Sequence, residues 1–373
     1  MGITNNSIRP TRISSLDVTR AIALVGVVMM NYHAYLNKDK AFYPQYPSFA
    51  ERIFNPLSGI LTTRFAATFV LVAGMSIALL VHSAIQSGNA DLIRSAQMKL
   101  ARRGLFLYAL GAAVQWIWPG TILFYYGAFL LISAVMCTWP NRSLVAVSVA
   151  SIAISTGVSA WRGYQFFEGN FTQWLSPAPN TPRNLLIRTF VDYTHPVFPW
   201  ITFICAGIIL GRNLERLSQL RTRIMLWSSF SLFVTFLIRT FVMPDSLSTQ
   251  SDYVLQRALS TNNHDHSVLH VTSTLAVALL VFCCISFITD SRVNSRAVTF
   301  LARTGQMTLS IYLAHVLVFN LVVNWLNWVR PTGLDTALVL SLAFYAVAVP
   351  ASSLYFRRFG IGPCERVYRA FGG

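Results

Sequence analysis

The sequence contains few charged residues, and especially few acidic ones. Charged residues make up 11% of its 373 residues, with 13 Asp and Glu against 29 Lys and Arg. A soluble globular domain carries roughly a quarter charged residues, because its surface must face water. Together with a hydrophobic content of 54%, this deficit excludes an ordinary soluble domain and indicates a chain whose surface faces lipid.

The net charge of +16 could suggest a nucleic-acid partner, but its distribution does not. A nucleic-acid binder gathers its basic residues on one polar face. Here they lie in short clusters between apolar stretches. We therefore expect no nucleic-acid partner.

The chain also lacks a disulfide framework and internal repeats. Its five cysteines lie in or beside apolar runs or near the C-terminus, which predicts buried, inert thiols. No repeat is evident, so a transporter built from repeats gains no support. No small-residue cleavage site follows the first apolar run, so we expect that helix to be retained.

Long apolar stretches are present instead. A transmembrane helix needs about 20 mainly apolar residues, and the sequence predicts an all-α, polytopic membrane protein of about ten such helices in a single domain, 1–373. The third and fourth spans are short, with a tight turn at Pro119-Gly120 between them. The ten spans lie near 17–36, 57–81, 103–118, 120–138, 143–161, 196–211, 224–243, 267–289, 305–328 and 334–356.

The basic clusters predict the orientation of these spans. Roughly two thirds of the 29 basic residues fall on one side of a ten-span arrangement, and the positive-inside bias makes that side cytoplasmic. Both termini are then cytoplasmic, in an integral protein of the bacterial inner (plasma) membrane. The long connections 37–56, 162–195 and 244–266 lie outside. Their aromatic and proline residues suit either an interfacial belt or a vestibule for a sugar or lipid.

Polar residues inside a span are costly and mark candidate sites. At 100° per residue, Asp17, Arg20 and Asn31 share one face of the first helix. They form either an interfacial ion pair with Asn31 capping the helix end, or a polar track across the membrane. Arg64, inside the predicted second span, is expected to face a polar cavity or a carboxylate.

Several segments resemble a known family. "RISSLDVTRAIALVGVVMMN" is similar to the opening motif of YeiB-like membrane proteins and of heparan-alpha-glucosaminide N-acetyltransferase, two arms of the transmembrane acyltransferase superfamily. The resemblance implies acyl transfer from cytoplasmic acetyl-CoA, or another acyl-CoA, to an extracytoplasmic sugar or glycolipid, with Arg20 and Asn31 as active-site positions. The further motifs are "FVLVAGMS", "RRGLFLYALG", "GTILFYYG", "HPVFPWITFICAGIILGR" and "FGIGPCERVYR".

The chain departs from this pattern at three places. Ala21 replaces the glycine that usually follows the motif arginine, and Thr121 stands where YeiB-like proteins commonly carry Asp. Phe42 and Tyr43 occupy the region of the heparan enzyme's catalytic histidine. That histidine has no counterpart here.

Acyl transfer still needs a general base, and histidine is the usual choice near neutral pH. His33 is close to Asn31 in the sequence but shares its face only if the helix ends at Asn31. His195 precedes a helix start, and Asp192 could orient its imidazole. His270 and His315 remain as alternatives, with His315 expected to be a structural histidine bonded to a neighbouring helix.

The donor's phosphates call for arginines. Arg102 and Arg103, near Lys99, start the third span and could bind them, or could serve only as positive-inside anchors. Arg20 and Arg64 are expected to line the acyl-CoA path. The segment "NNHDHSVLH" is more typical of a solvated loop than of a metal site, so no metal is expected.

The sequence thus favours a membrane acyltransferase acting on an envelope sugar or glycolipid. A transporter or flippase for an envelope lipid or sugar is the alternative, since Arg20 and Arg64 would equally suit an anion path. A non-catalytic partner subunit is a third possibility. The acceptor, the acyl chain and the oligomeric state stay open.

Overall fold

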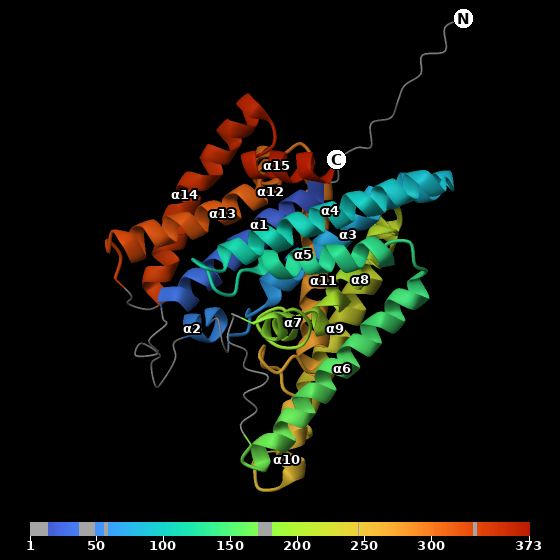
Figure 1. The fold of residues 1–373 in the computed structure, drawn as a ribbon, viewed down its shortest axis with the longest axis vertical. Coiled ribbons are helices and arrows are strands. Elements are labelled where there is room, and N and C mark those ends of the chain that lie inside the picture. Colours follow the sequence, from blue (N-terminus) through green and yellow to red (C-terminus); the bar gives the residue numbers. More distant parts are fainter. Residues whose placement is uncertain (1–13, 37–48, 56–58, 171–180, 245, 331–333) are drawn as a thin grey trace, which may run out of the picture.

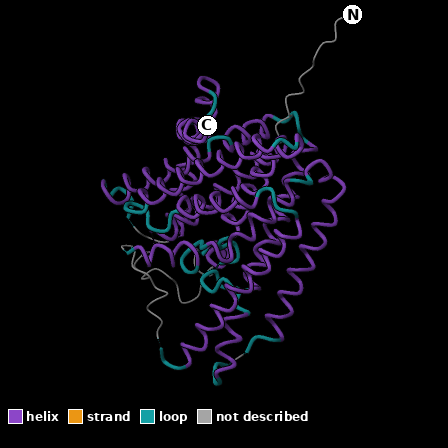
Figure 2. The backbone as a smooth tube through the Cα atoms, turned by 45° about the vertical axis from the view of Figure 1, so that its right-hand side comes forward, coloured by secondary structure: helices purple, strands orange, loops and turns teal. Residues whose placement is uncertain are grey.

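The computed structural model describes the chain except for residues 1–13, 37–48, 56–58, 171–180, 245 and 331–333. Every regular element in the described ranges is a helix (Figure 2), which confirms the all-α prediction. The elements are α1 (Ser14–Leu36), α2 (Phe49–Phe54), α3 (Arg64–Ser87), α4 (Ala90–Val114), α5 (Ile122–Met136), α6 (Asn141–Phe167), α7 (Pro182–Phe190), α8 (Val197–Gly211), η2 (Leu214–Arg216), α9 (Leu217–Phe241), α10 (Gln250–Ala258), α11 (Val268–Ser291), α12 (Arg296–Gly305), α13 (Thr308–Phe319), η3 (Asn320–Trp325), α14 (Leu334–Phe359) and α15 (Pro363–Gly372).

Among the described residues, seven helices are long and apolar enough to cross a membrane: α1, α3, α6, η2–α9, α11, α13–η3 and α14. Two more, α5 and α8, are apolar but shorter. The remaining predicted span corresponds to α4, whose first half carries charged residues. The chain is therefore a multi-pass integral membrane protein, while ten spans and cytoplasmic termini stay predictions.

Short helices mark the two ends of the bundle. Helix α15 lies near the C-terminus at the top of Figure 1, while α2, α7 and α10 lie in its lower half. We call these the α15 end and the α7 end. Helix α1 runs from the α15 end to the α7 end and α3 runs back, since Arg20 contacts Ser76 and Gly26 packs against Phe65.

Helix α1 is the centre of the bundle, packed against α3, α11, α12, α13 and α14. Its residues Leu24, Val28 and Tyr32 are almost completely buried. Close packing elsewhere depends on small residues, as expected between membrane helices. A Cβ at Gly74 of α3 or Gly207 of α8 would collide with the backbone of the other helix.

The outer helices expose large apolar side chains. Trp227 of α9 is 71% exposed, and Phe230, Phe233 and Phe236 are more than half exposed. Such a row would be an aggregation hazard in water but is the normal surface of a helix facing lipid. This pattern agrees with the membrane prediction.

Two predicted boundaries have different outcomes. The turn between α4 and α5 is confirmed, because Gly120 adopts a left-handed φ of 87° that suits glycine. The second span was predicted too early at 57–81. Helix α3 starts only at Arg64, after a turn in which Thr63 has a φ of 64°.

Candidate active site

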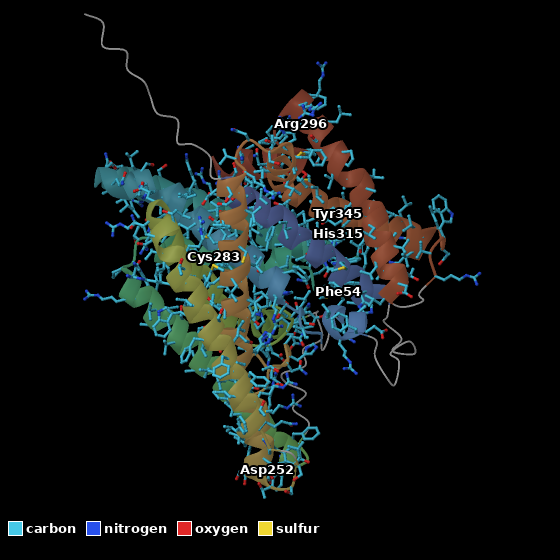
Figure 3. All side chains as sticks on the ribbon, turned by 180° about the vertical axis from the view of Figure 1, so that it is seen from behind. Phe54, Asp252, Cys283, Arg296, His315 and Tyr345 are labelled. Atoms are coloured by element: carbon cyan, nitrogen blue, oxygen red, sulfur yellow. The ribbon has the colours of Figure 1, made fainter. Side chains whose placement is uncertain are left out.

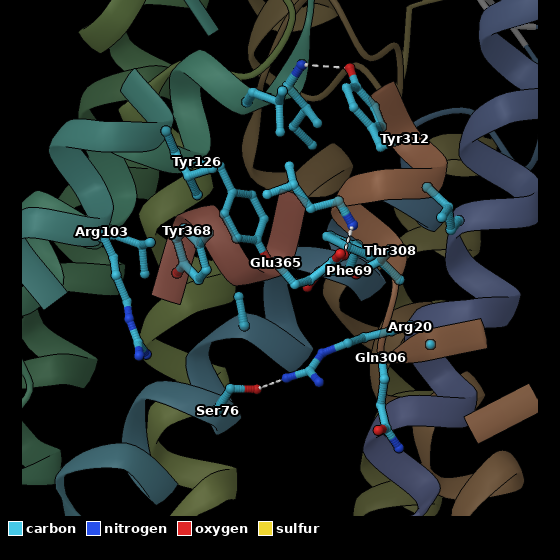
Figure 4. A pocket seen from close by; sticks show the side chains of 18 of the residues that line it. Arg20, Phe69, Ser76, Arg103, Tyr126, Gln306, Thr308, Tyr312, Glu365 and Tyr368 are labelled. Atoms are coloured by element: carbon cyan, nitrogen blue, oxygen red, sulfur yellow. Dashed lines mark hydrogen bonds between the residues drawn. The ribbon is translucent and has the colours of Figure 1, made fainter. Parts of the chain in front are cut away.

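Two cavities lie along the same face of α1. The first, which we call the arginine cavity, lies toward the α15 end, has a volume of about 270 Å³ and includes Arg20, Arg103 and Arg369 in its wall (Figure 4). The second, the histidine cavity, lies toward the α7 end, has a volume of about 340 Å³ and is lined by Asn31 and His195 among others. Of the predicted stripe on the first helix, Arg20 lines the arginine cavity and Asn31 the histidine cavity, while Asp17 lines neither.

Arg20 projects from α1 into the arginine cavity. Its Nη1 donates to Oδ1 of Asp17 at 2.8 Å, and its Nη2 donates to the hydroxyl of Ser76 on α3 (Figure 4). Asp17 is buried. The ion pair fixes the direction of the guanidinium and leaves its outer edge toward the cavity, where an anionic donor group can approach.

Arg103 of α4 lies on the opposite wall. Its guanidinium stacks over the ring of Tyr368, with 5.3 Å from Cζ to the ring centroid, and its buried Nε has no hydrogen-bond partner in the described structure. Arg102 is exposed and does not line the cavity, because consecutive helix residues point about 100° apart. The expected pair of donor-binding arginines is therefore reduced to Arg103.

The C-terminal helix forms part of the wall of this cavity, which the sequence did not predict. Glu365 accepts hydrogen bonds from the backbone N–H groups of Leu309 at 2.7 Å and Ser310 at 3.1 Å, at the start of α13. A carboxylate is favoured at a helix N-terminus, where it satisfies free N–H groups. This cap holds α15 so that Tyr368 and Arg369 line the cavity.

His195 is the ionisable residue of the histidine cavity that best suits proton transfer. It lies just before α8, with its ring edge-to-face against Trp200 at 4.4 Å between centroids. Its Nδ1 is buried without a hydrogen-bond partner in the described structure. Burial lowers the pKa of His195 to about 3, helped by the neighbouring His266. The imidazole is therefore neutral and keeps a lone pair at neutral pH.

Asn31 links the histidine cavity to the core. Its Nδ2 lies 3.3 Å from Nε2 of His315, whose Nδ1 bonds to the carbonyl oxygen of Tyr312. A carbonyl only accepts, so Nδ1 of His315 carries the proton and Nε2 accepts from Asn31. His315 lies in the middle of the molecule (Figure 3) and lines neither cavity. It is bonded to a neighbouring helix, as expected.

The two other predicted members of the catalytic group lie elsewhere. Helix α1 continues to Leu36, so His33 points away from Asn31, and its Nδ1 lies 3.0 Å from the carbonyl oxygen of Phe54 in α2. The condition under which His33 would face Asn31 is therefore not met. Asp192 forms an ion pair with Arg162 of α6, which argues against the expected pairing of Asp192 with His195.

Arg64 is not on the side of Arg20. As the first residue of α3 it lies at the α7 end, about 18 Å along the helix from Ser76, the partner of Arg20. It lines a third, polar cavity there. The prediction that Arg64 lies deep inside a span was wrong, because the apolar residues before it belong to a turn rather than to the helix.

The arginine and histidine cavities meet at three residues. Val27, Ile122 and Tyr312 line both. All three are buried, and the hydroxyl of Tyr312 lies 3.0 Å from Oγ1 of Thr121 and accepts from the N–H of Ile122 at 3.2 Å. These three buried residues, which we call the collar, therefore lie between the cavity lined by three arginines and the cavity lined by His195. Within the described ranges, no group of three or more His, Cys, Asp or Glu side chains could hold a metal ion.

The fold and the paired cavities define a multi-pass helical membrane protein with one cavity toward each end of its central helix. Comparison with protein families agrees with this class. Residues 12–240, more than half of the chain, match the family described as heparan-alpha-glucosaminide N-acetyltransferase, catalytic, and the chain belongs to this family. Residues 207–372 match the family described as protein of unknown function (DUF418). The chain matches no curated protein.

The matched regions connect the two halves of the site. Helices α1, α3, α4 and α5, which form most of the arginine cavity, lie within 12–240, as does His195 of the histidine cavity, while α13 and α15 lie within 207–372. The suspected kinship with both arms of the superfamily is therefore confirmed, and with it the membrane acetyltransferase-like character of the chain.

Proposed function

We propose that the protein transfers an acyl group, acetyl in the simplest case, from cytoplasmic acyl-CoA to a sugar or glycolipid at the opposite face of the membrane. The observation that carries this proposal is the meeting of the arginine and histidine cavities at Val27, Ile122 and Tyr312. A thioester arm reaching that collar from one side would meet an acceptor coming from the other.

The arginine cavity would bind the acyl-CoA donor. Arg103 and Arg369 suit the phosphates of CoA, and Arg20 suits its polar arm, because guanidinium groups bind phosphates with paired hydrogen bonds. The basic clusters of the sequence favour a cytoplasmic location for the α15 end. The collar would then admit the acyl chain and exclude the charged nucleotide.

His195 would activate the acceptor. Its neutral imidazole would take the proton of the acceptor hydroxyl or amine as that group attacks the thioester carbonyl. The carbon–sulfur bond breaks, the thiolate of CoA leaves, and a proton passes to it. Asn31 donates through Nδ2 to His315, so its Oδ1 can accept a hydrogen bond from the incoming acceptor. A covalent acyl-imidazole on His195 would use the same geometry.

The experiment is turnover by purified protein in proteoliposomes. Acetyl-CoA is added on the side of the C-terminus, a lipid and sugar extract of the cell envelope on the other, and release of the free thiol of CoA is followed. We expect thiol release that depends on the extract, with an acetylated product identified by mass spectrometry. Movement of an extract component across the membrane with acetyl-CoA left intact would contradict the proposal and favour a transporter.

A further inference from the structure

A third cavity adjoins the histidine cavity at the α7 end. It has a volume of about 420 Å³ and is lined mostly by polar side chains, three of them arginines: Arg64 of α3, Arg239 of α9 and Arg257 of α10. Nothing in the proposed chemistry uses these arginines. Under the proposed orientation they lie outside, where the positive-inside bias gives no reason for them.

Among the described residues, the charges in this cavity do not balance. Arg257 is neutralised by Asp265, with 2.5 Å from Nη1 to Oδ1. Arg64 and Arg239 have no carboxylate partner in the part of the chain that the structure describes. Arg64 Nη1 donates to the carbonyl oxygen of Thr62 at 3.3 Å, and its Nε is buried without a hydrogen bond.

Arg239 stands at the exposed side of the same cavity. Its Nη1 donates to Oγ1 of Thr261 at 3.1 Å, which leaves the rest of the guanidinium open. Holding an unpaired cation such as Arg64 in a partly buried polar cavity costs free energy that a bound anion would recover. Arg239 lines the same cavity and could bind that anion as well.

The third cavity also opens toward the proposed reaction centre. Thr62 and Asn263 line both it and the histidine cavity. The side-chain oxygen of Asn263 is buried and has no hydrogen-bond donor among the described residues. A sugar that reached from one cavity to the other would pass this oxygen and could donate a hydroxyl to it.

We propose that Arg64 and Arg239 bind the anionic group of the acceptor, a carboxylate or a phosphate, so that a neighbouring hydroxyl or amine reaches His195. The acceptor is then an acidic or phosphorylated saccharide, free or attached to a lipid. This inference rests on the proposed function for the role of the ligand, but the anion site can be tested without any acyl transfer.

Binding is measured on purified protein in phosphatidylcholine nanodiscs, in the absence of acyl-CoA. Methyl β-glucuronide and glucose 1-phosphate are compared with methyl β-glucoside, which has the same ring without the charge. We expect the two anionic sugars to bind more tightly than the neutral one. Arg64→Gln and Arg239→Gln should each weaken them about tenfold or more, as for a lost charge-assisted hydrogen bond.

Arg183→Gln is the matched control. Arg183 lies on α7 at the same end of the bundle, is exposed and lines none of the cavities described. It should leave binding unchanged, whereas Arg64→Lys should restore part of the affinity. Equal affinity for glucuronide and glucoside, or normal anion binding by the Arg64→Gln and Arg239→Gln double variant, would overturn the proposal.

Adding phosphatidylglycerol to the nanodiscs distinguishes a lipid-linked acceptor from a free one, and both from a bound membrane lipid. Competition by this lipid together with binding of the anionic sugars would support a lipid-linked acceptor, and binding without competition a free one. If phosphatidylglycerol alone occupies the site and no anionic sugar binds, the cavity holds a membrane lipid and the acceptor proposal is wrong. None of these outcomes depends on thiol release, so failure of the anion site and failure of acyl transfer are distinguishable.

Discussion

The arginine and histidine cavities differ in the one property that matters for moving an acyl group across a membrane. The arginine cavity includes three guanidinium groups, whereas none of the described residues that line the histidine cavity is a lysine or an arginine. A cation fixes the charged end of a donor but adds nothing to proton transfer. The structure thus separates the groups suited to hold a donor from the groups suited to activate an acceptor, and joins them through the collar.

The separation also matters for the basicity of His195. A guanidinium beside it would repel the imidazolium that forms when it takes a proton, and would lower the pKa of His195 further. Trp200 and Tyr125 surround it instead, with ring centroids at 4.4 Å and 5.7 Å from that of His195. These apolar surroundings would keep the proposed base uncharged until an acceptor arrives.

The largest effect is expected from removing the base. His195→Ala should lower acyl transfer by about 10²–10⁴-fold with acyl-CoA binding retained, because general-base catalysis contributes that much. His82→Ala is the control, since His82 is exposed at the end of α3 near the α15 end. His33→Ala should act on stability rather than on turnover. Near-normal transfer by His195→Ala would show that another group is the base, and His264, which lines the same cavity, would be the next residue to test.

Blocking the collar should break the connection between the cavities. Val27→Phe adds a ring where they meet and should lower transfer about 10²-fold, as for a misplaced reacting group. Donor binding, measured by calorimetry with acetyl-CoA, should change little. Val25→Phe on the same helix is the control, because Val25 is 40% exposed on the outer face. Equal transfer by both variants would show that the acyl group takes another route.

A smaller effect is expected on donor affinity. Arg103→Ala should weaken acyl-CoA binding roughly tenfold to a hundredfold, the usual loss for a charge-assisted hydrogen bond. Arg102→Ala removes the same charge one residue away and should leave affinity nearly unchanged, because Arg102 lies outside the cavity. If both variants lose affinity equally, the arginines act only through the general field of the cytoplasmic surface.

Helical periodicity was enough to predict the wall shared by the cavities. Arg20 and Asn31 lie on one face because α1 is unbroken. In a regular helix, eleven residues make about three full turns, so the two side chains point in nearly the same direction. The same continuity removes His33 from that face. Arg64 was misplaced because a hydropathy window cannot separate apolar turn residues from helix residues when no charge lies between them.

Contacts between distant segments could not be predicted from the sequence. The partner of Asp192 is Arg162, thirty residues earlier, and the cap that Glu365 provides joins α15 to α13. The motif containing Glu365 was visible, but nothing in its spacing connects it with Arg20. Such juxtapositions follow from how helices pack, which depends on the whole bundle.

The last prediction concerns stability toward acid at the α7 end. This end contains buried imidazoles, which distinguish it from the basic α15 end. Burial lowers the pKa of His266 to about 4, although its bond to the carbonyl oxygen of Tyr193 and the carboxylate of Asp192 oppose the shift, and His195 shifts to about 3. Both values lie below the ordinary value of about 6.5, so the unfolded chain binds protons that the folded chain does not. Stability is therefore complete above about pH 6.5 and is lost as the pH falls toward 4.

The apparent Tm in nanodiscs should accordingly fall by several degrees between about pH 7.5 and pH 5. His266→Asn should reduce this slope, and asparagine tolerates the φ of 49° at this position. His82→Asn, at an exposed position, should keep the wild-type slope. An unchanged slope in His266→Asn would mean that His266 is protonated in the folded protein, and the neutral-imidazole account of the neighbouring His195 would then lose its support.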